Sequence, residues 1–182
     1  MYLIMNLKNT SDSYGFISKN FHWILAILLL SNFFLGFIMV ELERGPLKSS
    51  IYGFHKSTGI LLLSLIILRL FWRSINITPI PVANNKLLNR LAKSVHLFFY
   101  FVVFMITLSG WTYSTARVGP VEVFGLFYMP AIVGINDQVG RIAKEIHIYS
   151  VYLFIAFVIL HVLASIYHHF FLKDRTLKRM WY

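Results

Sequence analysis

Histidine is the residue type in this chain with the most chemistry to offer. There are seven histidines and no cysteine, which excludes disulfide scaffolds, iron–sulfur clusters, thiolate zinc sites and haem attachment through CxxCH. His147 and His161 stand in the relation i and i+14. In an α-helix this spacing is nearly four turns, so the two rings would face the same side about 21 Å apart. One helix could thus contribute to two sites at different depths.

The composition indicates that the helices carrying these histidines cross a membrane. Of 182 residues, 58% are hydrophobic and 13% are charged, against about 25% charged residues in soluble domains. Apolar segments long enough to span a bilayer recur along the chain. We predict an all-α integral membrane four-helix bundle, one domain over residues 1–182, with helices at about 21–40, 51–73, 93–116 and 146–172 and an outer-surface loop at 117–145.

The distribution of charge predicts the orientation of the bundle. The two tails and the second connection with its flanks hold eleven Lys and Arg residues and two acidic residues, a net charge of +9. The first and third connections hold six basic and five acidic residues, a net charge of +1. The positive-inside rule then places both termini in the cytoplasm. The basic residues are divided among three segments, which argues against a nucleic-acid partner and favours contact with anionic lipid.

This topology places four histidines in two pairs, and the two members of each pair lie at the same depth in the membrane. His22 and His161 fall at the inner level, and His55 and His147 fall at the outer level. Two imidazoles facing each other across an apolar bundle suit a haem iron with both axial positions filled, whereas zinc usually takes three or four ligands. Small residues lie near these histidines and would leave room for a porphyrin: Ala26, Gly59, Ala143, Ala164 and Ser165.

Further residues at the inner level are candidates for binding or proton transfer. His55 and Arg69 have the same i and i+14 relation, so Arg69 could pair with a haem propionate or extend to the interface as an ordinary helix-end arginine. His96 could replace His22 as a ligand, bind a quinone headgroup, or do neither. His168 or His169, at the end of the last helix, could relay a proton or act as an interfacial anchor.

Several motifs resemble the bacterial cytochrome b561 family, the small di-haem b-type quinone-linked membrane cytochromes. The likeness runs from about residue 14 through nearly the whole chain. It rests on His22-Trp23, on Gly53-Phe54-His55-Lys56 with Gly59 and Arg69, on Phe124-Gly125-Leu126 with Met129-Pro130, on His147 with His161, and on the tail from His168-His169 to Met180.

The resemblance implies a function and a set of site residues. It implies two b haems, an outer one held by His55 and His147 and an inner one held by His22 and His161, in a bacterial inner membrane. It also implies electron exchange with the quinone pool, and in some family members superoxide oxidation at the outer face. Five acidic residues on the outer side weaken the attraction for an anionic donor, so superoxide is the less secure part of this expectation.

Three functions remain open from the sequence. The chain could be a free-standing oxidoreductase or electron carrier for quinone, alone or as a homo-oligomer, with an unknown electron donor. It could instead be a cytochrome b subunit that relays electrons for a partner redox enzyme. A non-redox proton or metal carrier lined by the same histidines is the third reading.

Overall fold

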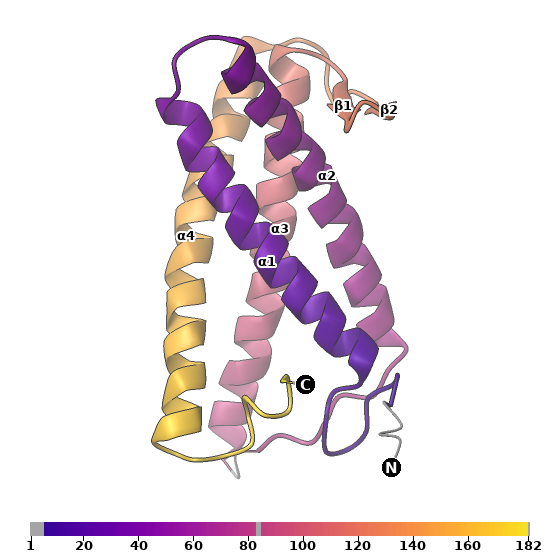
Figure 1. Cartoon of the computed structure of the whole chain (residues 1–182), viewed down its shortest axis with the longest axis vertical. Helices are drawn as coiled ribbons and strands as arrows, with labels where there is room; N and C mark the ends of the chain where they lie inside the picture. The colour runs from indigo at the N-terminus through magenta and orange to yellow at the C-terminus, as the bar shows by residue number, and fades with distance from the viewer. Residues whose placement is uncertain (1–5, 83–84, 182) are drawn as a thin grey trace.

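Four long helices dominate the computed structural model, which describes residues 6–82 and 85–181 (Figure 1). They are α1 (Phe16–Glu41), α2 (Pro46–Ser74), α3 (Lys86–Arg117) and α4 (Asp137–Phe170). Each is long and apolar enough to cross a membrane. The chain is therefore a four-helix, multi-pass membrane protein, as the apolar segments predict.

The helices pack as two antiparallel pairs. α1 packs on α2 and α3 packs on α4, while contacts between α2 and α3 join the two pairs. A small buried core lies where they meet and consists of Leu25, Leu62, Leu63, Ile66, Val102, Val103 and Phe154. Most other large apolar side chains are exposed on the outside of the bundle, as expected for a protein whose surroundings are lipid.

The bundle has two distinct ends (Figure 1). Both chain termini and the connection between α2 and α3 lie at one end, here called the termini end. The connection between α1 and α2 lies at the other end together with the segment between α3 and α4, and this is called the hairpin end. His55 and His147 belong to the hairpin-end halves of α2 and α4, and His22 and His161 to the termini-end halves of α1 and α4.

All four helices begin earlier than the apolar segments suggest: α1 begins at Phe16 and α2 at Pro46, five residues early in each case, and the two largest differences are at α3 and α4. α3 begins at Lys86 and not near residue 93, and α4 begins at Asp137 and not near residue 146. The cause is capping: the Asn85 side chain accepts from Leu87 N at 2.8 Å, and the Asn136 side chain accepts from Val139 N at 3.0 Å. These caps extend polar helical turns beyond the apolar layer and shorten the third connection.

The rest of that connection contains a β-hairpin that the sequence pattern did not indicate. Strands β1 (Val121–Val123) and β2 (Phe127–Met129) are antiparallel, with Glu122 opposite Tyr128. Val121 and Val123 are buried against Ile60 of α2. Strands of three residues are too short to show a clear alternation of apolar and polar positions.

The C-terminal tail folds back against the start of α1. Trp23 Nε1 donates to Met180 O at 2.9 Å, and Lys19 Nζ donates to Trp181 O at 2.6 Å. Arg179 donates to Ile80 O at 2.5 Å, which connects the tail to the segment after α2. The tail therefore covers the termini end next to His22, whose ring lies 5.2 Å from that of Trp23.

Candidate functional site

His55 and His147 face each other at the hairpin-end level. Their ring centroids are 6.3 Å apart, and the ring planes are inclined at 80°. Each ring is oriented by the main chain of a helix other than its own. Nδ1 of His55 lies 3.1 Å from Asn32 O of α1, and Nδ1 of His147 lies 2.8 Å from Ile106 O of α3.

These carbonyl contacts determine which ring nitrogen can bind a metal. A carbonyl oxygen can only accept, so Nδ1 must carry the proton in both rings. The neutral ring then has its lone pair on Nε2, and this is how metal-binding histidines are usually oriented by their surroundings. Both rings of this pair are thus prepared to ligate through Nε2.

Two glycines make room for these rings, and neither is among the small residues predicted from the sequence. A Cβ on Gly110 would lie 3.0 Å from Nδ1 of His147, and one on Gly36 would lie 3.4 Å from Cε1 of His55. Gly36 and Gly110 occupy the i+14 positions relative to His22 and His96. The spacing that relates His147 to His161 was therefore the available signal. Of the predicted small residues, Ala143 is buried, and a Cβ on Gly59 would meet nothing within 4 Å.

The termini-end level brings together three imidazoles. The ring of His161 lies 6.3 Å from that of His22 and also 6.3 Å from that of His96. Phe99 packs against the same ring at 5.5 Å. His161 thus has two imidazole neighbours at the same distance, and this spacing allows either His22 or His96 to be the second ligand.

Two arginines flank this cluster. A guanidinium nitrogen of Arg69 lies 3.5 Å from Nδ1 of His22, so Arg69 reaches the histidines at the termini end. Arg69 and Arg73 also both approach the Tyr100 ring, at 5.6 and 5.7 Å from its centroid. Like charges four residues apart on a helix repel each other. Among the described residues neither guanidinium has a carboxylate in ion-pair range, so the two together favour binding of an anion.

The ring spacing fits a metal held between two imidazoles. With metal–nitrogen distances of about 2.0–2.1 Å and ring centres about 1.1 Å further out, two opposed histidine rings have centroids about 6.2–6.4 Å apart. A bare edge-to-face pair can have the same spacing. The protonated Nδ1 atoms of His55 and His147 favour the metal-binding pair over a bare ring pair, because they leave the Nε2 lone pair of each ring available to a metal. No three His, Asp or Glu side chains form an ordinary metal-ion site within residues 6–82 and 85–181, and a haem iron needs only two.

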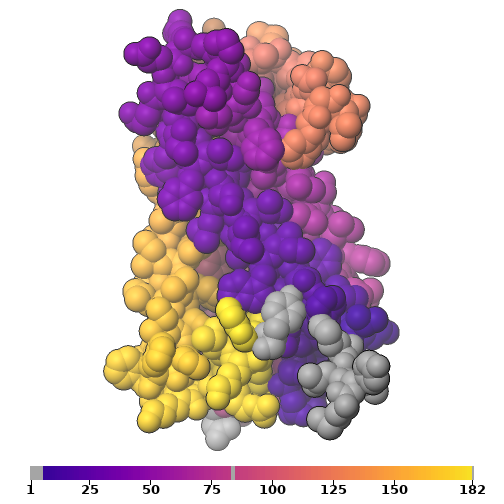
Figure 2. Space-filling model, in the orientation of Figure 1, coloured from indigo at the N-terminus to yellow at the C-terminus, as the bar shows by residue number. Residues whose placement is uncertain are grey.

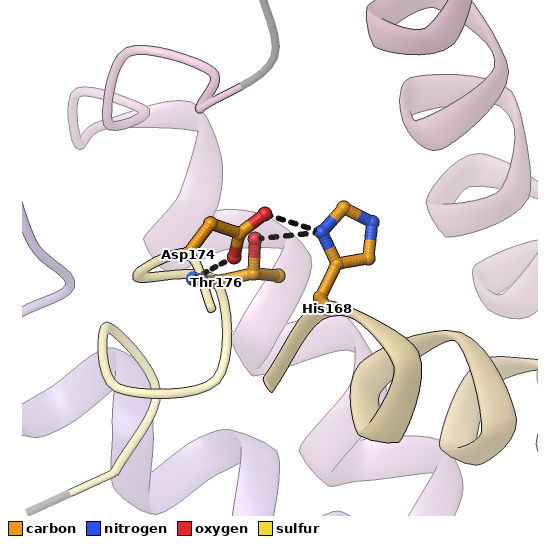
Figure 3. A network of polar contacts seen from close by, with 3 residues as sticks. All are labelled: His168, Asp174 and Thr176. Carbon is orange, nitrogen blue, oxygen red and sulfur yellow. Dashed lines mark hydrogen bonds and ion pairs between the residues drawn. The ribbon is translucent and has the colours of Figure 1, made fainter. Parts of the chain in front are cut away.

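His168 and His169 differ in their surroundings at the end of α4. Nδ1 of His168 lies 2.5 Å from Oδ2 of Asp174, and the Thr176 hydroxyl lies 3.4 Å from the same nitrogen (Figure 3). Burial alone would raise the pKa of the Asp174 carboxyl, but hydrogen bonds from His168 and Thr176 outweigh it and hold that pKa below its usual range. His169 has a buried Nδ1 with no hydrogen-bond partner. His168 is therefore the one built into a polar network.

Comparisons with known proteins show what the whole chain is similar to. Residues 13–182 match the family model described as prokaryotic cytochrome b561. The chain is also 36% identical over 184 residues to a curated protein of Escherichia coli (strain K12), cytochrome b561 homolog 2, and the match covers 97% of this chain and 95% of that protein.

Proposed function

Because the chain belongs to the prokaryotic cytochrome b561 family, we propose that it is a di-haem b-type cytochrome that carries electrons across a bacterial inner membrane. The family implies b-type haem and a membrane location. The observation that carries the proposal is the His55–His147 pair, whose spacing and fixed Nδ1 protons suit axial ligation. Each bound haem would supply a one-electron iron couple.

In this proposal His55 and His147 hold the haem at the hairpin end, and His22 and His161 hold the haem at the termini end. His147 and His161 are nearly four turns apart on α4, so the two levels are separated by about 21 Å along the helix. Buried apolar side chains of α1, α2 and α3 lie between them, including Leu25, Leu62 and Val102. They exclude water from this layer and keep the dielectric low.

Arg69 and Arg73 would bind the propionates of the haem at the termini end. A carboxylate in a partly buried place is costly unless a charged partner compensates it. A guanidinium offers two parallel donors to a carboxylate. Both guanidiniums lie against Tyr100, and that of Arg69 also lies 3.5 Å from Nδ1 of His22. This role extends the propionate role predicted for Arg69 to a second residue.

Quinone would exchange electrons at the termini end. His96 lies beside His161, and His168 follows His161 by nearly two turns along the same side of α4. Quinone reduction takes up protons and quinol oxidation releases them, and His168 with Asp174 and Thr176 offers a hydrogen-bonded route for either transfer (Figure 3). With both termini in the cytoplasm, as the charge distribution predicts, these protons would be exchanged with the cytoplasm.

A quinol-reduction experiment tests this function. The purified protein in lipid vesicles is mixed with a reduced short-chain quinol, and the haem α-band is followed in time. We expect quinol to reduce the haem, and we expect His168→Gln to slow the reduction at least tenfold while the dithionite-reduced spectrum stays unchanged. His169→Gln is the matched control at the next position. Full reduction by dithionite with none by quinol would reject the quinone assignment and leave the haem assignment standing.

A further inference from the structure

The β-hairpin projects sideways from the hairpin end of the bundle, beside α2 (Figures 1 and 2). Its tip, Phe124–Phe127, carries large apolar side chains: Leu126 is 79% exposed, and Phe127 is 51% exposed. Across residues 118–136, which contain the hairpin, Glu122 is the sole charged residue. An exposed apolar tip in so uncharged a segment is typical of a surface that contacts something other than water.

The hairpin is held firmly on α2, so its tip has a defined position. The Ser57 hydroxyl accepts from Phe124 N at 2.9 Å and lies within donating distance of Glu122 O, at 3.2 Å. The turn is closed by Leu126 N, which donates to Val123 O at 2.9 Å. Phe124 and Gly125 both have left-handed backbone angles, with φ of 50° and 73°. Tight hairpin turns of type I′ require positive φ at both central residues.

The level of this attachment lies inside the expected membrane layer. α2 has no charge between Lys56 and Arg69. The hydrocarbon layer takes about 20 helical residues, so a layer centred on this uncharged stretch extends about four residues beyond each end, to about residue 53. Ser57 and Ile60, which hold the hairpin, therefore lie within the outermost part of that layer.

The tip also continues the lipid-facing surface of α2. Phe54 is 55% exposed on α2, and its ring lies 5.7 Å from that of Phe124 in an edge-to-face contact. The two rings form one apolar surface from the helix to the hairpin tip. Tyr128, which is 67% exposed next to the tip, is one of the two residue types enriched where a membrane meets water, because its ring has both an apolar body and a polar end.

We propose that the hairpin tip, Phe124–Phe127, inserts between the headgroups and the upper acyl chains of the membrane lipids next to α2. Glu122 lies on the other side of β1 from the buried Val121 and Val123 and is exposed, and in this proposal its carboxylate extends to the headgroups. The hairpin is thus a lateral membrane anchor, independent of what the histidines bind. It fixes the depth of the hairpin end, and with it the depth of His55.

Because the chain has no cysteine, single nitroxide labels can test this without altering other positions. Leu126→Cys is labelled in the full-length protein in lipid vesicles, with Glu43→Cys as the aqueous reference and Ile67→Cys as the lipid reference. Power saturation measures the accessibility of each label to oxygen, which prefers lipid, and to a water-soluble nickel chelate. We expect the oxygen-to-nickel ratio at residue 126 to exceed that at residue 43 at least threefold and to approach that at residue 67.

Two outcomes would overturn the proposal. A ratio at residue 126 equal to that at residue 43 would place the tip in water. Dipolar broadening between residue-126 labels that disappears on dilution with unlabelled protein would show that a second copy, and not lipid, covers the tip. Tyr128→Cys gives a second position if Leu126→Cys does not fold, and an unchanged absorption spectrum confirms folding of either variant.

Discussion

Nδ1 of His147 on α4 donates to the main-chain oxygen of Ile106 on α3, at 2.8 Å. This bond fixes the ring against a neighbouring helix and leaves Nε2 without a proton. The other ring of the pair also has a main-chain partner on another helix, because Nδ1 of His55 lies 3.1 Å from Asn32 O of α1. Helix packing therefore determines which nitrogen of each ring is available to a ligand.

Of the two glycines beside the histidine rings, Gly36 and Gly110, Gly110 should be the more sensitive to substitution. In Gly110→Ala the new methyl group would lie 3.0 Å from the His147 ring and would push it from the Ile106 carbonyl. We expect haem bound per polypeptide to fall by about half, because one of two levels is affected. Pyridine haemochrome analysis measures this. Gly36→Ala, with a contact of 3.4 Å, should show a smaller loss, and Gly134→Ala, with open space, should show none.

The three imidazoles at the termini end predict a ligand substitution. His96 is as close to His161 as His22 is, at 6.3 Å between centroids. We therefore expect His22→Ala to keep a six-coordinate haem at this level, with an altered low-temperature α-band, and His22→Ala/His96→Ala to lose it. If the single His22→Ala variant already loses as much haem as the double variant, His96 cannot reach the iron.

The sequence predicts the helices and the histidine levels because both depend on long-range regularities. Apolar runs of membrane length define the spans, and the i and i+14 relation places residues on one face. The orienting carbonyls of Asn32 and Ile106 depend on the register between helices, which no local pattern encodes. The hairpin depends on one hydroxyl, that of Ser57, and on contact with Ile60, so it too is visible only in three dimensions.

Asp174 predicts a pH dependence of the C-terminal tail. Its folded pKa lies below the ordinary value of 3.8, so its contribution to stability is complete above that value and is lost as the pH falls through the folded pKa. Asp174→Asn should therefore loosen the tail by about 1–2 kcal/mol at pH 7. The variant and the wild type should converge in acid, as the pH falls below the folded pKa of Asp174.

Amide hydrogen exchange of residues 175–181 measures this loss of tail stability. At each pH the exchange rate of the variant is divided by that of the wild type. Asp12→Asn, at the same end of the bundle, is the control and should leave the ratio near one. A ratio for Asp174→Asn that stays constant as the pH falls from 7 through the folded pKa of Asp174 would mean that the carboxylate charge does not hold the tail.

The direct test of the central claim is the number of haems bound by the purified protein and by two variants of α4. We predict two haems per polypeptide in the wild type and one each in His147→Ala and His161→Ala. The two remaining haems should differ in α-band position and midpoint potential, because each variant removes a different level. A single haem in the wild type, or two haems retained in His161→Ala, would contradict the proposed pairing.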